Sequence, residues 1–428
     1  MNAREKTELA LAKIADPNGE GARTCLTVYA ETARAAADAA DARAKAGISL
    51  GPLDGAIVSI KDLFDVAGEP TRAGSKILAD APPAKADAPV VRRLRAAGAV
   101  IVAKTSMSEF AFSGVGMNPH YGTPGNPADR TRVPGGSSSG AAVAAADHMC
   151  EIAIGTDTGG STRIPGALCG IVGFKPSAWR VPTEGAFPLS YSLDSIGPIA
   201  RTVEDCAKGD AVMAGEEYEP LSAAPVAGLR LGVPQGLLLT EWDNTVGTRF
   251  GAARKRLSDA GVRITDEPMP LIDAMVAVNQ KGGLAPSEAF SIHRDYLVKR
   301  ADEFDPNVRV RIERGGKVSA ADYIDMSRQR EQLIDAMDAQ ASAFDAWVLP
   351  TTPIVAPTIA EMQDTSTFGT KNMLLLRNTS TWNFFDMCAI SIPIPGSGLP
   401  VGLMLVARNG HDRRLFEIAA GIERLFAA

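Results

Sequence analysis

Histidine and cysteine are scarce in this sequence of 428 residues, which contains four of the first and five of the second. The cysteines are widely scattered and none has the C-x-x-C spacing of a zinc or redox site. We therefore expect reduced, mostly buried thiols and neither a metal nor a cofactor. The histidines are His120, His148, His293 and His411, and none lies in a recognisable motif. The sequence thus gives no indication of the histidine base that serine hydrolases usually employ.

Long hydrophobic runs and basic tracts are also missing. No stretch approaches the roughly 20 apolar residues that cross a bilayer, and the opening residues, MNAREKTELALAKI, lack the apolar core of a secretory signal. The 44 Lys and Arg residues against 50 Asp and Glu residues give a net charge of −6, which argues against a nucleic-acid partner. We expect a soluble cytoplasmic protein with no membrane partner. Its oligomeric state is left open, with a homodimer as one option.

What the sequence does contain is an alternation of short β-branched runs with helical patterns, which predicts an α/β fold. Hydrophobic residues make up 45% of the chain, enough for a large core, and the absence of repeats or linkers favours one large domain. The predicted helices are 2–16, 27–46, 88–98, 141–146, 245–260, 320–342 and 413–426. The predicted strands are 56–60, 99–103, 346–353, 389–395 and 401–407.

Glycine and serine are concentrated in two segments, PGGSSSG at 134–140 and GTDTGGSTRIP at 155–165. A glycine-rich loop before a helix can bind phosphate, but a P-loop needs a lysine after its glycines and none is present. The alternative is a serine hydrolase. Glycines beside Ser161 let backbone N–H groups converge on one point, as an oxyanion hole requires, so Ser161 is the candidate nucleophile.

A serine nucleophile needs a base, and lysine is the remaining candidate. Lys61, Lys104 and Lys175 each end an apolar run. Burial among aliphatic neighbours lowers the pKa of a lysine toward neutrality and frees its amine. Pattern alone leaves all three lysines open as the base, and each is also compatible with a structural role.

Together these segments resemble the amidase signature family. The match runs from Gly135 to Gly166 and extends to VSIKDLFDVAG at 58–68, AKTSMSEFA at 103–111, GIVGFKPS at 170–177 and SLDSIGPIARTVEDCA at 192–207. The resemblance implies a mixed central sheet covered by helices on both faces, in a single domain over 1–428. Its expected parts are a helical region at 1–50, a signature core at 50–210, a variable substrate-side region at about 210–345, and C-terminal strands and a helix at 346–428.

The resemblance also implies a site. Ser161 would be the nucleophile, Ser137 the proton relay after a cis peptide bond with Gly136, and Lys61 the base, with Lys104 and Lys175 structural. The expected oxyanion hole is formed by the backbone of Thr158, Gly159, Gly160 and Ser161. The expected supporting residues are Ser138, Asp157 and Arg163.

The expected substrate is a small carboxylic acid amide, or a related carbamate or urea derivative, hydrolysed through an acyl-enzyme. One alternative is the A-type glutaminase subunit of a tRNA-dependent amidotransferase, and another is a non-catalytic binding relative. Residues 365–385 contain no Asp or Glu, so the acid that would bind the ammonium of glutamine is not found there. The candidates for an apolar pocket wall are Met107, Phe110, Phe112, Met117, Trp382, Phe384 and Phe385, although each of them also suits an ordinary core.

Overall fold

The β-branched runs of the chain assemble into one mixed sheet of 11 strands in the computed structural model, which describes residues 1–428. The strand order is β1-β3-β2-β4-β6-β5-β10-β11-β9-β7-β8. The strands are β1 (Cys25–Val28), β2 (Ile57–Lys61), β3 (Val100–Thr105), β4 (Ile152–Thr156), β5 (Val172–Lys175), β6 (Ile196–Ala200), β7 (Arg230–Gln235), β8 (Arg263–Pro268), β9 (Ala346–Pro350), β10 (Cys388–Pro393) and β11 (Gly402–Ala407).

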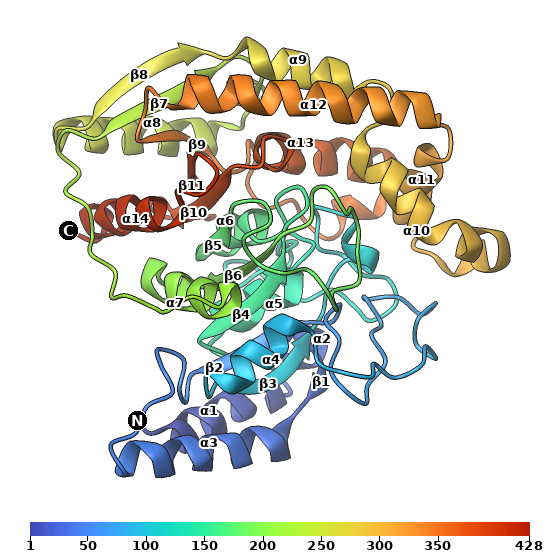
Figure 1. The fold of residues 1–428 in the computed structure, drawn as a ribbon, viewed down its shortest axis with the longest axis vertical. Helices are drawn as coiled ribbons and strands as arrows, with labels where there is room; N and C mark the ends of the chain where they lie inside the picture. Colours follow the sequence, from blue (N-terminus) through green and yellow to red (C-terminus); the bar gives the residue numbers. More distant parts are fainter.

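Helices cover both faces of this sheet (Figure 1). Four of them, α4, α7, α8 and α14, pack on one face, and the other face carries α1, α3, α5 and α6 and, further along, α9, α12 and α13. The helices are α1 (Ala3–Ala15), α2 (Gly21–Thr24), α3 (Ala30–Lys45), α4 (Pro89–Ala96), α5 (Ser139–Ala146), α6 (Arg163–Cys169), α7 (Val203–Ala214), α8 (Asn244–Asp259), α9 (Pro270–Asn279), α10 (Leu284–Arg300), α11 (Pro306–Gly315), α12 (Ala320–Ala341), α13 (Thr365–Phe384) and α14 (Asp412–Ala427).

The strand β11 shows why the central strands are apolar throughout. Its side chains alternate between the two faces, so that Leu403 and Leu405 join the largest apolar cluster while Met404 and Val406 join a separate cluster on the opposite face. A strand covered on both sides has no polar face. The predicted fold class, an α/β sheet with helices on both faces, is therefore confirmed.

The predicted elements match observed ones within a few residues except in one stretch, and several observed elements, α13 among them, were not predicted. The predicted helix at 27–46 begins only at Ala30, because residues 25–28 form the edge strand β1, which pairs antiparallel with β3. Leu26, Thr27 and Val28 suit a strand better than a helix. The long helix α13 was not predicted, since its many Thr and Asn residues are weak helix formers.

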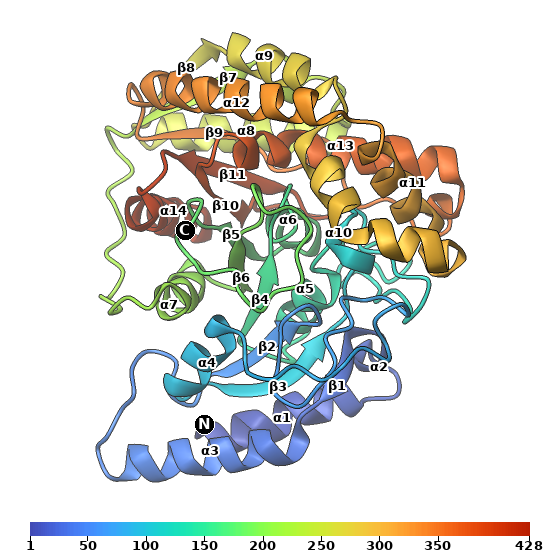
Figure 2. The ribbon, with the colours of Figure 1, turned by 45° about the vertical axis from the view of Figure 1, so that its right-hand side comes forward.

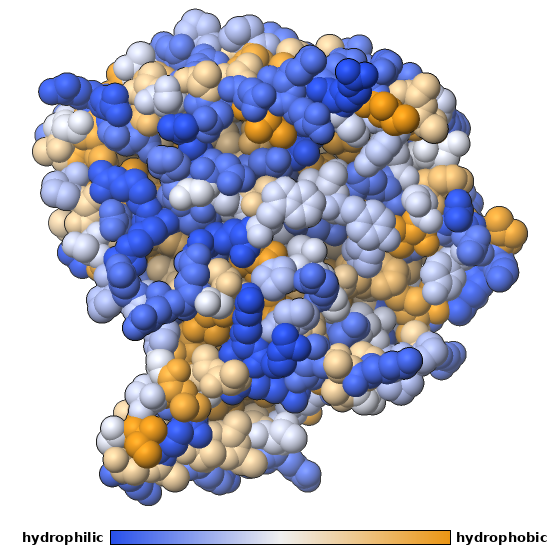
Figure 3. Space-filling view, viewed as in Figure 1, coloured by the Kyte–Doolittle hydropathy of each residue, from blue (hydrophilic) through white to orange (hydrophobic).

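Two parallel neighbours in the sheet, β2 and β4, end at the same edge, and ligands of α/β sheets bind beyond such carboxyl ends. The loops that lead into α5 and α6 meet there. Figures 1 and 2 both place α10 and α11 beside this edge, next to α13. The face seen in Figure 3 is mostly hydrophilic, with apolar residues in small groups. None of the helices is long and apolar enough to span a membrane.

Candidate active site

Lys61 is the last residue of β2, and its side chain is fully buried. Its Nζ lies 2.8 Å from Ser137 Oγ and 2.8 Å from Thr156 Oγ1, which it reaches because β2 and β4 end side by side. Burial lowers the pKa of Lys61 to about 7, and the negative charges of Asp194 and Asp157 oppose this only in part. A substantial fraction of the amine is therefore neutral near pH 7.

Ser137 lies in the loop before α5 and is fully buried. The peptide bond between Gly136 and Ser137 is cis, as the resemblance implied. The following residue fastens the two glycine-rich segments together: Ser138 donates from its backbone N–H to Ser161 O at 3.3 Å and from its hydroxyl to Thr156 O at 3.2 Å. Ser138 thus holds the Ser137 loop against the Ser161 loop.

Ser161 precedes α6 and has 4% of its surface exposed. Its hydroxyl lines a cavity and forms no hydrogen bond within the protein, with Ser137 or any other residue. The backbone N–H groups of Thr158, Gly159 and Ser161 also donate to no protein acceptor. Free N–H groups gathered around a hydroxyl are suited to stabilising a negatively charged oxygen.

Gly160 differs from the predicted oxyanion donors. Its N–H donates to Asp157 Oδ1 at 2.7 Å, and a donor already bound to a carboxylate is not free for an oxyanion. The set of free donors is therefore corrected to the other three residues. The position still requires glycine: φ is 133°, and a Cβ atom would lie 2.1 Å from Thr379 Oγ1.

Asp157 and Arg163 form a fully buried ion pair, with Arg163 Nη2 2.8 Å and Nε 3.0 Å from the carboxylate oxygens. Burial by itself raises the pKa of Asp157, but the charge and hydrogen bonds of Arg163 outweigh burial and hold that pKa well below its usual range. Thr162 donates to the same carboxylate from its N–H and its hydroxyl. The ionised Asp157 fixes the conformation of the loop that carries Ser161.

Two residues of α13 complete this network and were missed in the sequence. Asn383 donates to Asp157 and accepts from Arg163 Nη2 at 2.7 Å, and the backbone oxygen of Thr379 accepts from Arg163 Nη1 at 3.0 Å. Both lie more than 200 residues from their partners in the chain. Asn and Thr are common throughout this stretch, so neither residue was marked as a buried polar contact.

Asp194 was also missed, although it lies within a segment that carries the resemblance. Its carboxylate accepts from the Thr158 hydroxyl and from the backbone N–H groups of Leu189 and Ser190. Burial raises the pKa of Asp194 to about 6. Asp194 therefore positions a residue of the oxyanion loop and adds a negative charge near Lys61.

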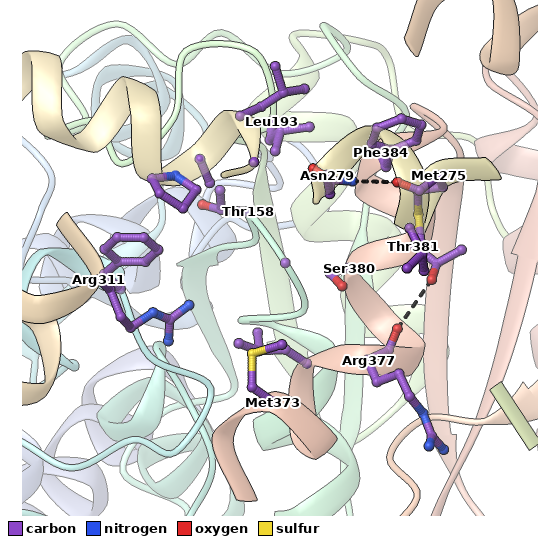
Figure 4. A pocket seen from close by; sticks show the side chains of 18 of the residues that line it. Thr158, Leu193, Met275, Asn279, Arg311, Met373, Arg377, Ser380, Thr381 and Phe384 are labelled. Atoms are coloured by element: carbon purple, nitrogen blue, oxygen red, sulfur yellow. Dashed lines mark hydrogen bonds between the residues drawn. The ribbon is translucent and has the colours of Figure 1, made fainter. Parts of the chain in front are cut away.

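A cavity of about 620 Å³ opens above Ser161 (Figure 4). Its walls come from α9, α10, α11, α13 and the loop that follows β3. Half of its lining is hydrophobic, and Met275, Leu284, Leu376 and Phe384 are among these residues. The cavity is large enough for a small organic amide.

The residues proposed for an apolar pocket wall divide between this cavity and the core. Phe112 and Phe384 line the cavity. The others pack elsewhere as buried or half-buried core residues: Met107, Phe110, Met117, Trp382 and Phe385. Two of seven positions were therefore identified, since an apolar residue in a sequence does not reveal which of these environments it occupies.

The two other lysines that the pattern left open lie away from the serines. Lys104 Nζ is buried and is 3.6 Å from the Glu69 carboxylate. Lys175 Nζ donates to Pro176 O at 2.6 Å, and burial lowers the pKa of Lys175 to about 8. Neither side chain contacts Ser137 or Ser161.

None of the four histidines lines the cavity. His293 is enclosed by Phe110, Phe187 and Phe304, and neither of its ring nitrogens has a hydrogen-bond partner. His120 contacts Glu109 at 2.7 Å. No three His, Cys, Asp or Glu side chains lie close enough together to hold a metal ion.

Comparison with known proteins agrees with this architecture. The sequence profile described as Amidase matches residues 5–416. The chain is 36% identical to 2-amino-5-chloromuconic acid deaminase from Comamonas testosteroni, over 99% of this chain and 94% of that protein. It is also 36% identical to a glutamyl-tRNA(Gln) amidotransferase subunit from Acidothermus cellulolyticus, over 100% of this chain and 92% of that protein.

A solved crystal structure of an amidase is similar to this fold with a TM-score of 0.89 and 32% sequence identity, covering 100% of this chain and 96% of that chain. These matches confirm the family resemblance that the glycine-serine segments carry in the sequence. The chain therefore belongs to the amidase family of C–N bond hydrolases.

Proposed function

We propose that the protein hydrolyses a small carboxylic acid amide, or a related carbamate or urea derivative, through an acyl-enzyme on Ser161, with Ser137 as proton relay and Lys61 as base. The observation that carries this proposal is the contact of 2.8 Å between Lys61 Nζ and Ser137 Oγ in a fully buried position. A buried lysine with a pKa of about 7 supplies a base at physiological pH.

The hydrogen bonds of Lys61 suit its neutral form. A neutral amine has two N–H donors and one lone pair. The neutral form of Lys61 keeps its donation to Thr156 Oγ1 and turns its lone pair to the Ser137 hydroxyl, across the same 2.8 Å over which the charged form donates to Ser137 Oγ. Proton removal from Ser137 then leaves its oxygen ready to take the proton of Ser161. The last transfer requires the Ser161 hydroxyl to rotate toward Ser137, because the two are not hydrogen-bonded in the free protein. Catalytic contacts of this kind often form only when substrate is bound.

The attack of Ser161 Oγ on the substrate carbonyl forms one C–O bond and moves an electron pair onto the carbonyl oxygen. The N–H groups of Thr158, Gly159 and Ser161 are the free donors that stabilise this oxyanion, and removal of one such donor typically costs about 3–4 kcal/mol of transition-state stabilisation. Collapse of the intermediate breaks the C–N bond. The leaving nitrogen receives a proton from Ser137, and Lys61 returns a proton to Ser137.

Water then attacks the acyl-enzyme. Lys61 and Ser137 accept a proton from this water as its oxygen bonds to the acyl carbon. Collapse of the second intermediate breaks the bond between the acyl carbon and Ser161 Oγ, Ser137 passes the proton to that oxygen, and the acyl group leaves as a carboxylic acid. The ordered loop that Asp157 and Arg163 hold keeps Ser161 and its neighbouring N–H groups in place for both steps. We further propose that the segment 210–345 selects the substrate, because Met275, Leu284 and Arg311 line the cavity.

The test compares the native protein with Ser161→Ala on a panel of short aliphatic amides, anilides, carbamates and urea derivatives. We expect turnover by the native protein, at least 1,000-fold slower turnover by the variant, and labelling of Ser161 by a fluorophosphonate, detected by peptide mass spectrometry. The Thr370→Ala variant, changed at an exposed position of α13 outside the cavity lining, is the matched control. Equal activity of the native protein and Ser161→Ala would contradict the mechanism, and no turnover on any substrate would favour a non-catalytic binding role.

A second candidate is the glutaminase subunit of a tRNA-dependent amidotransferase. The similarity to a glutamyl-tRNA(Gln) amidotransferase subunit supports it. Glutamine-dependent release of ammonia that is stimulated by co-purifying subunits would favour this role over that of an independent hydrolase. Either role takes place in a compartment that we propose to be the reducing cytoplasm, which the five free, buried cysteines support.

A further inference from the structure

One cationic side chain lines the cavity above Ser161 without an acidic partner. Arg311, on α11, contributes its side chain to the cavity wall. Its Nη1 is buried and donates to no acceptor, and no carboxylate lies within ion-pair distance of the guanidinium. Burial lowers the pKa of Arg311 to about 10, and the nearby positive charge of Arg314 adds to this effect.

Two other arginines near this position have partners. Arg309, two residues earlier on α11, pairs with Asp302 at 3.1 Å and with Glu313 at 3.3 Å. Arg377, the second cation that lines the cavity, donates to Thr240 O at 2.6 Å and is 3.5 Å from the Glu241 carboxylate. Arg311 is therefore the one cation of the cavity that keeps its hydrogen-bonding capacity free.

The position of the Arg311 guanidinium is fixed rather than free to swing. Its Cζ lies 4.3 Å from the centroid of the Phe112 ring, a stacking distance at which the aromatic face stabilises a cation. Figure 4 shows Arg311 reaching into the cavity from the side opposite Met275 and Thr381. The guanidinium is thus held at the cavity wall with Nη1 buried and without a hydrogen-bond partner, and a ligand in the cavity would meet its remaining N–H groups.

A partly desolvated charge without a partner is costly, and proteins compensate such charges with an opposite charge. Since the protein supplies no anion here, the natural partner is the molecule that fills the cavity. Guanidinium groups bind carboxylates through two parallel hydrogen bonds. This reasoning builds on the proposed hydrolysis at Ser161.

We propose that Arg311 binds a carboxylate of the substrate, so that the enzyme acts on small amides that carry a second, anionic end. The class consists of monoamides of dicarboxylic acids, with the amide at Ser161 and the carboxylate at Arg311. Arg311 is then a specificity-determining residue that contacts substrate at a distance from the bond that breaks.

The same cavity disfavours substrates that also carry an ammonium group. Glu241 is the only acidic residue of the lining, and it is exposed and paired with Arg377. No free carboxylate is therefore available to bind a substrate cation. Glutamine and asparagine, which have both an α-carboxylate and an α-ammonium, are expected to be poorer substrates than the corresponding monoamides without the ammonium.

The experiment uses pairs of substrates that differ only in charge at the distal end: malonamate with propionamide, succinamate with butyramide, and glutaramate with valeramide, with glutamine as the zwitterionic member. We expect kcat/KM of the native enzyme to favour the anionic member of at least one pair by tenfold or more. Arg311→Met is expected to lower kcat/KM for that anionic substrate about 10- to 150-fold, chiefly through KM, as loss of hydrogen bonds to a charged group implies. Its kcat/KM for the neutral partner should change less than about threefold.

Arg309→Met is the matched control, because it removes the same charge from the same helix outside the cavity, and it is expected to retain the native preference. Preference of the native enzyme for the neutral member of every pair, or an equal loss on both members in Arg311→Met, would overturn the assignment. A second readout needs no variant. The dicarboxylate with the chain length of the preferred substrate is expected to protect native Ser161 from fluorophosphonate labelling, and valeramide at equal concentration should protect it less. Absence of protection by the dicarboxylate would also count against the assignment of Arg311. Failure of Ser161 to react with fluorophosphonate at all would instead refute the proposed function.

Discussion

The pH dependence of catalysis is the sharpest consequence of a buried Lys61. The pKa of this residue is lowered from 10.5 to about 7. Only the neutral amine acts as a base, so kcat/KM is expected to rise with pH, with a single ionisation near pH 7, and to differ about tenfold between pH 6 and pH 8. The assay is steady-state hydrolysis of one amide in buffers of constant ionic strength from pH 5 to pH 9.

The size of this shift follows from the enclosure of the ammonium group. Each pKa unit corresponds to about 1.4 kcal/mol, so burial disfavours the charged form of Lys61 in the folded protein by about 5 kcal/mol. Because the folded pKa lies below the unfolded one, the unfolded protein binds more protons between about pH 7 and pH 10.5. In this window the contribution of Lys61 to the free energy of unfolding increases with pH.

A variant separates Lys61 from other groups that titrate in this range. Asp194 raises the pKa of Lys61 through its negative charge, so Asp194→Asn is expected to move the acid limb of the kcat/KM profile to lower pH. Asp210→Asn is the matched control, since Asp210 is a buried carboxyl group whose pKa burial raises to about 7 but whose partner is Arg180, outside the site. A profile that is flat from pH 5.5 to pH 8, or one that moves to higher pH in Asp194→Asn, would refute the assignment of Lys61 as base.

Two further predictions concern the stability of the fold. Asp157→Asn leaves the buried Arg163 without its counter-ion and is expected to lower the free energy of unfolding by about 3–5 kcal/mol in urea titrations. The control Asp129→Asn breaks a more exposed pair with Arg132 and should lower it by at most about 1 kcal/mol. Equal effects of the two variants would contradict the role of the Asp157 pair. Burial lowers the pKa of His293 from 6.5 to about 4, so its protonation favours the unfolded state and stability should fall by about 3 kcal/mol as the pH drops from 6.5 to 4. His293→Phe should remove that part of the loss, measured as thermal midpoints at pH 4.5 and pH 7.5, and an unchanged loss in this variant would show that other groups cause it.

The sequence indicates the reacting groups because local motifs carry them. Ser137 and Ser161 stand in short glycine-rich segments, whose residue types already suggest their environment. Lys61 ends an apolar run, but Lys104 and Lys175 do so too, and only the family resemblance selected Lys61 among them. The Asp157 and Arg163 pair is also local, because the two residues are six positions apart in the sequence. The apolar runs at 346–353, 389–395 and 401–407 likewise predict strands, because buried strands need uninterrupted apolar residues.

What the sequence does not reveal depends on contacts between distant segments. Asn383 resembles any amide in a polar helix until the fold brings it to Asp157. Arg311 is one of several arginines on α11, and no pattern distinguishes it from Arg309, which is paired. The Gly160 N–H was assigned to the oxyanion hole because a motif names residues but not the direction in which each N–H points.

The pairing of β5 with β10 has a consequence for the biosynthesis of the enzyme. In this pairing, residues 389–391 lie beside Gly173, Phe174 and Lys175. The helix α13 holds the loop of Ser161 in place. Both late segments leave the ribosome long after Lys61, Ser137 and Ser161. A nascent chain therefore holds every reacting group well before it holds the helix that fixes them. On the proposed mechanism, hydrolytic competence is acquired late, when the segment from Thr365 onward docks, and translation products truncated before α13 are expected to be inert.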